Sequence, residues 1–381
     1  MKVILSIDPI RYPLTGIGRY THELARGLQQ AGLEDLQFLQ GTKLRPNLPT
    51  PTNVLAMSKM PVWRTWVRKS SLAVSLFQVA NPLLKGLALR GLEDHVFHGP
   101  NYYLPPFSGR SVVTIHDLST YLWPKTHPPE RVRYMCSEIE LSLKRASILI
   151  TDTESTRREV ASYFSWPIER IYAVPLASAE AFRPREYLEI FPVLRSLNLS
   201  PGGYTLFAGT IEPRKNIGVL LDAYISLPQA TRTRWPLVIA GYTGWASKDL
   251  HGRFDKARRE GWLIYLGFVP DDVLPILMAG ARLFAYPSLY EGFGLPVLEA
   301  MACGVPVVCS NAASLLEVAG TAAGFHAPAD VAGLAGLLQL GLEDETWRAV
   351  MRAAGVAQAA NFSWQRCRRE TIVAYEAALD M

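Results

Sequence analysis

The chain has 381 residues, of which 49% are hydrophobic and 19% are charged, and this length predicts two domains. The ordinary composition excludes a disordered, collagen-like or repeat protein, and no apolar run approaches the ~20 residues of a membrane-spanning helix. The net charge of +5 is uneven, because residues 1–180 hold 21 Lys and Arg against 15 Asp and Glu, whereas the remainder is almost neutral.

Strand-like and helix-like runs alternate along the first half, which predicts an α/β domain with a parallel sheet and helices on both faces. The expected strands are Val3–Ile7, Leu36–Leu39, His95–His98, Ser111–Ile115, Ile148–Thr151 and Ile171–Val174. Helices are expected at Tyr20–Gln30, with Gly32 as the stop, and at Val132–Ala146. From Val174 to Pro201 the composition predicts a linker.

Alternation restarts after this linker, so a second doubly wound domain is expected. Its strands are predicted at Tyr204–Ala208, Leu237–Ala240, Leu263–Leu266, Leu283–Tyr286 and Val305–Cys309. Helices are expected at Gly218–Ser226, at Pro296–Ala302 and at Trp364–Ala378, the last one capped by Ser363. Because such sheets bind ligands beyond the carboxyl ends of their strands, both domains should aim their loops into a shared interdomain cleft.

Two loops of the first half carry candidate binding residues. Gly16, Gly18 and Arg19 follow a strand and open a helix, where free N–H groups suit an anion. The third glycine of a dinucleotide fingerprint is replaced by Thr21, which disfavours a nicotinamide dehydrogenase, and an ordinary turn remains an alternative. His116 ends a predicted strand and is expected to donate to a sugar or phosphate oxygen, the alternative being a structural histidine.

A third loop places Arg214 and Lys215 at the start of a predicted helix, after a turn that contains Gly209. Arginine binds phosphate oxygens in a bidentate fork, lysine adds a point charge, and the helix dipole favours negative charge at the same place. This pattern predicts a diphosphate site. The alternative is a solvated basic turn.

A fourth loop places Glu291 in a glycine-containing turn and Glu299 inside the following apolar helix segment, which Pro296 is suited to begin. A carboxylate at Glu299 can accept paired bonds from vicinal hydroxyls, as on a ribose, and a buried carboxylate needs such partners. The alternative is an exposed glutamate favoured by the dipole of the helix's first turn.

Together these loops resemble the retaining nucleotide-sugar glycosyltransferases of family 4, which have the GT-B fold. The resemblance is carried by Gly16–Tyr20, His116–Asp117, Gly209–Asn216 and the E-x7-E pattern of Glu291 and Glu299. It implies two Rossmann-like domains, with acceptor binding in residues 1–182, donor binding in 183–363 and a helix at 364–381 that returns to the first domain. Within the family, the chain looks most like bacterial mannosyl- and D-rhamnosyltransferases of O-antigen synthesis.

The resemblance also implies a role for each matching residue. It assigns the donor diphosphate to Arg214 and Lys215, and the nucleotide ribose to Glu299. It places Glu291 and His116 as catalytic residues beside the donor sugar. Backbone N–H groups would come from Phe293, Gly294 and Leu295, the base would lie at Val269, and the phosphate and acceptor would lie beside Gly16, Gly18 and Arg19.

The implied reaction moves mannose or D-rhamnose from a GDP-sugar to a polyprenyl-diphosphate-linked saccharide. No Asp-x-Asp motif is present, so neither a metal nor a cofactor is expected, and Arg214, Lys215 and helix N-termini must offset the diphosphate charge. Front-side attack assisted by the leaving phosphate is expected to retain the anomeric configuration. The alternatives are a UDP-sugar donor, a nucleotide-sugar epimerase or hydrolase, and a non-enzymatic nucleotide-sugar binding module.

The segment Pro61–Arg90 contains no acidic residue and combines aromatic with basic side chains, which are Trp63, Arg64, Trp66, Arg68, Lys69, Phe77, Lys85 and Arg90. Helical spacing of its apolar residues predicts peripheral contact with an anionic membrane leaflet, the alternative being a helix packed into the core.

The four cysteines show no metal-ligand or disulfide spacing, which suits the cytoplasm. No nucleic-acid-binding signature is found, so nucleic acid is not expected as a partner.

Overall fold

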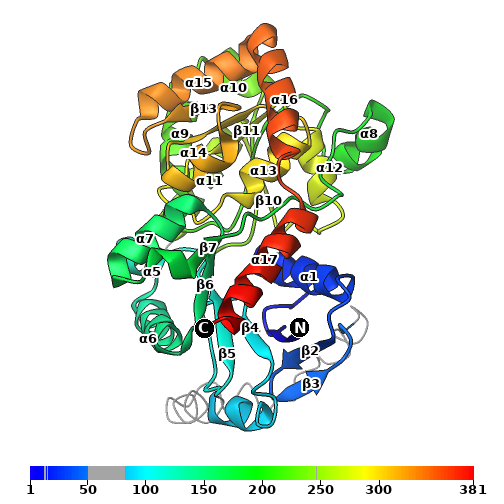
Figure 1. Ribbon diagram of the computed structural model, residues 1–381. Helices are drawn as coiled ribbons and strands as arrows, with labels where there is room; N and C mark the ends of the chain where they lie inside the picture. Colours follow the sequence, from blue (N-terminus) through cyan, green and yellow to red (C-terminus); the bar gives the residue numbers. More distant parts are fainter. Residues whose placement is uncertain (13, 15, 50–81, 246) are drawn as a thin grey trace, which may run out of the picture.

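The computed structural model describes residues 1–12, 14, 16–49, 82–245 and 247–381. Two domains lie one above the other, each built around a parallel sheet with helices on its faces (Figure 1). This arrangement confirms the predicted pair of doubly wound α/β domains.

The described part of the first domain forms a seven-stranded sheet in the order β3-β2-β1-β4-β5-β6-β7, and of these strands only β3 runs antiparallel to its neighbour. Its strands are β1 Lys2–Ser6, β2 Asp35–Gln40, β3 Lys43–Arg45, β4 Val96–Gly99, β5 Arg110–Thr114, β6 Ile148–Thr151 and β7 Ile171–Ala173. Its helices are α1 Gly16–Gln29, α5 Ser119–Leu122, α6 Pro129–Arg145 and α7 Glu154–Phe164, with short 3₁₀ helices at Pro124–Thr126 and Ile168–Arg170. Strands β4 and β6 are buried at every residue, as expected where helices cover both faces of a parallel sheet.

The second domain has a six-stranded sheet in the order β10-β9-β8-β11-β12-β13. Its strands are β8 Thr205–Ala208, β9 Leu237–Ala240, β10 Leu263–Gly267, β11 Leu283–Tyr286, β12 Val307–Ser310 and β13 Ala323–His326. Its helices are α8 Tyr187–Ser196, α9 Ile217–Ser226, α10 Gln229–Arg234, α11 Lys248–Arg259, α12 Leu274–Ala279, α13 Leu295–Ala302, α14 Ala313–Ala319, α15 Val331–Glu343 and α16 Glu345–Ala359, with 3₁₀ helix η3 at Pro213–Lys215.

The last helix, α17 (Trp364–Leu379), leaves the second domain and packs against α1 and the sheet of the first domain (Figure 1). The hydroxyl of Ser363 accepts a hydrogen bond from the backbone N–H of Arg366, so the predicted cap is confirmed. Tyr375 of this helix is fully buried, and its hydroxyl lies 2.7 Å from Nδ1 of His98 on β4. The helix thereby ties the carboxyl end of the chain to the first domain.

Most predicted elements match observed ones within one or two residues, although some predictions were wrong. The predicted linker contains helix α8, which begins with a reciprocal capping box between Glu186 and Glu189. Two edge strands, β3 and β13, were not predicted, and the strand expected at Val305–Cys309 begins instead at Val307. Edge strands and polar helix starts have weak hydrophobic periodicity, which explains why they were missed.

The strand order places one crevice position in each domain. In the first sheet the chain winds from β1 toward β2 on one side and continues from β4 on the other, so the order reverses between β1 and β4. In the second sheet the same reversal lies between β8 and β11. Loops separate at such a reversal, and in open α/β sheets ligands bind there.

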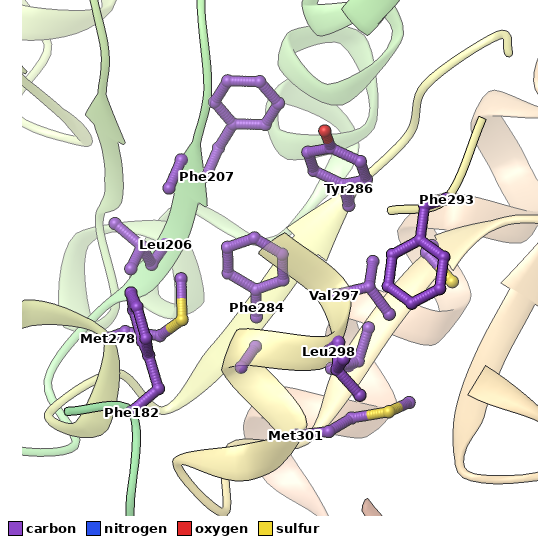
Figure 2. Packing of buried hydrophobic residues seen from close by; sticks show 14 of the residues in the cluster. Phe182, Leu206, Phe207, Met278, Phe284, Tyr286, Phe293, Val297, Leu298 and Met301 are labelled. Carbon is purple, nitrogen blue, oxygen red and sulfur yellow. The ribbon is translucent and has the colours of Figure 1, made fainter. Parts of the chain in front are cut away.

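Apolar packing fixes the helix that follows β11. Val297, Leu298 and Met301 of α13 lie in the same buried cluster as Phe284 and Tyr286 of β11 (Figure 2). All five side chains are at most 1% exposed. Deleting such a side chain typically costs 2–5 kcal/mol, so the position of α13 against the sheet is strongly determined.

Among the described residues, no helix is both long enough and apolar enough to cross a bilayer.

Candidate active site

The loops after β8 and β11 meet at the reversal point of the second sheet and bring together three of the predicted residues. Arg214 and Lys215 lie on η3, and Glu291 lies in the loop between β11 and α13. The backbone N–H of Leu289 donates to the carbonyl of Arg214 over 2.8 Å, which holds the two loops against each other. The reversal point therefore carries three residues that the sequence analysis had singled out separately as candidate site residues.

Both oxygens of Glu291 are engaged by cations. Nζ of Lys215 donates to Oε1 over 2.6 Å, and Nη1 of Arg214 donates to Oε2 over 2.8 Å. Nη2 of Arg214 also donates to Glu212 over 2.8 Å, while Nζ of Lys215 donates to the hydroxyl of Tyr286 over 2.5 Å. The Nε atom of Arg214 is buried and has no hydrogen-bond partner among the described residues.

These ion pairs control the protonation of the cluster. Burial by itself would raise the pKa of Glu291, but the charges of Arg214 and Lys215 outweigh it and lower the pKa to about 2. Burial lowers the pKa of Lys215, and the opposing charge of Glu291 limits that shift. At neutral pH Glu291 is thus an ionised carboxylate with both oxygens bound, an arrangement that suits neither a general acid nor a free nucleophile.

Helix α13 presents its N-terminus beside this cluster. Gly294 precedes the helix with φ of 103°, a left-handed conformation that favours glycine, and a Cβ there would lie 2.4 Å from Leu315. Pro296 lies in the first turn, as predicted. Phe293 is buried and Leu295 is the first helical residue, so the backbone at 293–295 lies where the first-turn N–H groups lack helical acceptors and can receive an anion.

Glu299 is buried one turn into α13 and pairs with the first domain. Nη1 of Arg19, on α1, donates to Oε1 of Glu299 over 2.5 Å, and Nη2 of Arg19 lies 3.7 Å from Asp271. Burial raises the pKa of Glu299 to about 7, and Arg19 opposes that rise only in part. The Oε2 atom of Glu299 makes no hydrogen bond to the described residues, so it can still accept one from a hydroxyl.

Arg19, predicted to lie beside the phosphate and the acceptor, thus bridges the two domains. Its guanidinium bridges to the second domain because α1 begins at Gly16 and carries residue 19 toward α13. Gly16 lies next to Leu295, whose side chain would be 3.8 Å from a Cβ at residue 16, whereas Gly18 is buried within α1. The glycine loop and the N-terminus of α13 face each other across the domain interface.

His116 follows β5 and has both ring nitrogens bound within the first domain. Nδ1 lies 2.8 Å from Asp152 and Nε2 lies 2.9 Å from the carbonyl of Pro100. Burial would lower the pKa of His116, but Asp152 outweighs it and raises the pKa, which favours an imidazolium that donates from both nitrogens. The ring differs from the expected free donor, because both N–H groups are already used by protein acceptors.

The two domains touch directly at this point. A Cβ at Gly292 would lie only 1.8 Å from the carbonyl oxygen of His116, so only glycine permits this approach. The hydroxyl of Thr153 donates to the carbonyl of Gly292 over 3.0 Å. The hydroxyl of Tyr290 donates to Glu159 over 2.6 Å and accepts from the backbone N–H of Leu118 over 3.1 Å. The donor-side loop is thereby held against the carboxyl ends of β5 and β6.

The residue predicted to hold the base, Val269, follows β10 and is buried. Gly267 before it has φ of 67°, and the ring of Phe268 stacks on Tyr242 with centroids 4.6 Å apart. Tyr242 and Phe268 are both exposed, so this loop presents an accessible aromatic pair at the carboxyl ends of β9 and β10.

Among the described residues, no group of three or more His, Cys, Asp or Glu side chains could hold a metal ion.

Several residues of the site were missed by sequence reasoning. Asp152 binds His116, Asp271 approaches Arg19, and Tyr290 links the domains. Asp152 comes directly after a predicted strand, and this position alone was a usable signal, because carboxyl ends of parallel strands share one edge of the sheet. The roles of Asp271 and Tyr290 depend on contacts between domains, which leave no local sequence pattern.

Comparisons with known proteins agree with this geometry. Residues 196–358 match the family model described as glycosyl transferases group 1. The chain is 43% identical over 379 residues to "O-antigen chain mannosyltransferase B" of Escherichia coli, which covers 99% of this chain and all of that protein. It is also 34% identical to "Serotype-specific mannosyltransferase WbdA" of Escherichia coli over 67% of this chain, and spans about a third of that protein.

Solved structures show the same fold at low sequence identity. WaaG, described as a glycosyltransferase involved in lipopolysaccharide biosynthesis, matches with a TM-score of 0.68 and 15% identity, covering 98% of this chain and 99% of that one. HepE of Anabaena in complex with UDP and glucose matches with a TM-score of 0.67 and 16% identity, covering 98% of each chain. These likenesses support the GT-B arrangement of the two domains.

Proposed function

The chain belongs to the group 1 glycosyl transferases with the GT-B fold, and from this premise we propose that it is a retaining mannosyltransferase that extends an O-antigen chain. The observation that carries the proposal is the full-length likeness to a mannosyltransferase together with the charged cluster at the reversal point of the second sheet. We propose GDP-mannose as the donor and a saccharide as the acceptor. GDP-D-rhamnose is the second donor to test.

The donor diphosphate is assigned to Arg214, Lys215 and the N-terminus of α13. Arg214 and Lys215 lie in the loop after β8, and the backbone N–H groups of Gly294 and Leu295 lie at the end of the loop after β11, so both loops at the reversal point can supply donors. Donors fixed before the substrate arrives need no reorganisation when negative charge grows on the leaving group. Glu299 is assigned to the ribose through its free oxygen, which adds a hydrogen bond at the nucleoside end.

The ion pairs of the Glu291 carboxylate support a reaction in which the acceptor attacks C1 of the sugar on the same face that the diphosphate leaves. Its oxygens are held by Arg214 and Lys215, so it is assigned to orienting these cations rather than to attack on the sugar. In the proposed step, the bond between C1 of the sugar and the diphosphate oxygen breaks, and the acceptor oxygen bonds to C1 on the same face. The proton of the acceptor hydroxyl passes to the departing diphosphate oxygen, so no protein base is required.

We also propose that the acceptor is linked to a polyprenyl diphosphate and that the protein works at the inner face of the cytoplasmic membrane. Most of the predicted membrane segment lies outside the described residues. Of its described part, Leu83, Leu84 and Leu87 are exposed on the helical segment 82–88, as an interfacial helix requires. The expectation for Lys85 was wrong, since Lys85 turns inward and pairs with Asp8.

The proposal is tested by incubating the purified full chain with GDP-mannose, GDP-D-rhamnose or UDP-glucose, each with and without a mannose oligosaccharide as acceptor. We expect nucleotide release and chain extension with GDP-mannose, and an α-configured product by NMR, since the sugar of GDP-mannose is α-linked. Turnover that needs no acceptor would favour an epimerase or hydrolase. Binding of the nucleotide sugar with no turnover under any acceptor would favour a binding module.

A further inference from the structure

A cavity of about 350 Å³ lies in the second domain between α8, α16 and the turn after α12. The turns that line it come directly before β8, β11 and β12, and they contribute Gly202, Ala281 and Pro306. The candidate active site instead uses the loops after β8 and β11, so the two positions lie at opposite ends of these strands. Its volume is within the ~300–1,000 Å³ of small-molecule sites.

Three arginine side chains line this cavity. Arg185 comes shortly before α8, whereas Arg348 and Arg352 lie one turn apart on α16. Because helix residues four positions apart are neighbours on one face, these two side chains share the face of α16 that borders the cavity. A Cβ at Gly304 would lie 3.3 Å from Nε of Arg352, so this side chain extends over the turn before β12. Positive charge thus reaches the cavity from two separate segments of the chain.

The positive charges around the cavity exceed their counter-charges. Glu345 is the one carboxylate among the lining residues, and its Oε1 accepts from Arg282 over 2.6 Å while its Oε2 accepts from Arg348. Arg352 forms no ion pair with the part of the chain that the structure describes. Burial, together with the charges of Arg282 and Arg352, lowers the pKa of Arg348 despite the opposing charge of Glu345. An anion in the cavity would therefore relieve repulsion between arginines.

Side chains rather than backbone groups can supply hydrogen-bond donors to such an anion. Backbone N–H groups that border the cavity already donate to carbonyls, which is the case at Gly202, Gly280, Ala281 and Gly304. Nη2 of Arg185 donates to the carbonyl of Ala181 over 2.9 Å, and Nη1 lies 3.5 Å from Glu189. Arg183 holds the same Glu189 oxygen more closely, at 2.6 Å, so Glu189 neutralises Arg185 only in part.

We propose that this cavity binds a phosphate dianion, either inorganic phosphate or the phosphate group of a monoester, between Arg185 and the pair Arg348 and Arg352. The planar guanidinium group matches the spacing of phosphate oxygens and can bind two of them at once. Tyr187 also lines the cavity and stacks on Phe191 with centroids 5.1 Å apart, so it offers an aromatic face to the organic part of a monoester.

The position of this site links it to both connections between the domains. Arg185 ends the segment that leads from β7 of the first domain into the second, and α16 leads directly into α17, which returns to the first domain. An anion bound by Arg185 and by α16 would bridge these two connecting segments. The site is separate from the proposed donor and acceptor positions, so the inference stands or falls independently of the proposed function.

Thermal unfolding of the full chain at increasing concentrations of inorganic phosphate tests the proposal, with sodium chloride keeping the ionic strength constant. Phosphate also stabilises folded proteins in general, so the site is measured by the part of the rise in Tm that saturates. We expect Arg352→Gln to raise the Kd obtained from this saturation about tenfold or more, because a charge-assisted hydrogen bond is lost. Arg185→Gln should act in the same direction.

Arg369→Gln is the matched control, since Arg369 is exposed on α17, does not line the cavity and forms no ion pair with the described residues. Lys215→Ala, at the proposed diphosphate site, should also bind phosphate as the parent chain does. Tighter binding of mannose 1-phosphate than of inorganic phosphate would support a monoester as the ligand, and equal binding would support free phosphate.

Three results would overturn the inference. The first is a Tm that rises without saturation in the parent chain, which would show only the general effect of the salt. The second is a Kd within twofold of the parent value in both Arg352→Gln and Arg185→Gln. The third is loss of saturable binding in Lys215→Ala with both arginine variants unchanged, which would assign the phosphate to the donor site.

Discussion

Replacing Glu291 with glutamine removes the negative charge that Arg214 and Lys215 share while keeping the shape of the side chain. In the native protein the pKa of Glu291 is lowered from 4.5 to about 2, with burial opposing and the two cations overriding it. At about 1.4 kcal/mol per pH unit this difference corresponds to ~3 kcal/mol of stability at neutral pH. The glutamine variant should therefore unfold with a free energy ~3 kcal/mol below that of the parent chain.

The sign of the pH dependence follows from the lowered pKa. The folded protein holds Glu291 ionised more strongly than the unfolded chain does, so the stabilisation is complete above pH 4.5 and is lost as the pH falls toward 2. At pH 3 protonation should already have removed ~2 kcal/mol of it. The difference in the free energy of unfolding between the parent chain and Glu291→Gln is thus expected to be constant from pH 7 to pH 5 and to become smaller below pH 5.

Urea unfolding at a series of pH values, followed by tryptophan fluorescence, measures this gap. Subtracting the free energies of unfolding of the two proteins cancels the contributions of the carboxylates that they share. Glu180→Gln, at an exposed carboxylate, is the control and should show almost no gap at any pH. A gap for Glu291→Gln that stays unchanged down to pH 3, or that widens in acid, would refute the assignment of a charge-stabilised carboxylate at this position.

Four further outcomes are expected. Arg214→Ala and Lys215→Ala should each lower kcat/KM for the donor about tenfold or more, because a charge-assisted hydrogen bond to phosphate contributes ~1.5–3 kcal/mol; near-normal turnover in both would contradict the diphosphate assignment. Turnover should be the same in EDTA as in Mg²⁺ or Mn²⁺, and loss in EDTA with rescue by either metal would count against the metal-independent mechanism. Gly292→Ala should abolish transfer, because its Cβ would meet the carbonyl of His116, whereas Gly252→Ala, with open space around it, should remain active; an active Gly292→Ala would show that this contact is dispensable. The full chain should sediment with anionic vesicles and be released at high salt, and equal binding to neutral vesicles would exclude an electrostatic membrane contact.

Local sequence patterns were sufficient to predict the alternating strands and helices of the two domains. Short apolar runs bounded by glycine, proline and polar residues determine buried strands such as β6, β9 and β11, since burial on both faces requires continuous apolar sequence. The same alternation placed Arg214, Lys215 and Glu291 at carboxyl ends of strands. Their meeting in a single cluster depends on β8 and β11 being neighbours in the sheet, and the order of the strands along the chain does not reveal this pairing.

Contacts between the domains were decided only by the tertiary structure. The sequence alone identified Arg19 and Glu299 as chemically able to bind a ligand, but it carried no signal that they bind each other across 280 positions of the chain. Likewise, His116 was recognised by its position after a strand, while the acceptors that occupy both of its nitrogens come from two other loops. Periodicity and turn chemistry act over a few residues, so they determine elements and their order. The pairing of charges between elements depends on the relative placement of two domains, which long-range packing alone sets.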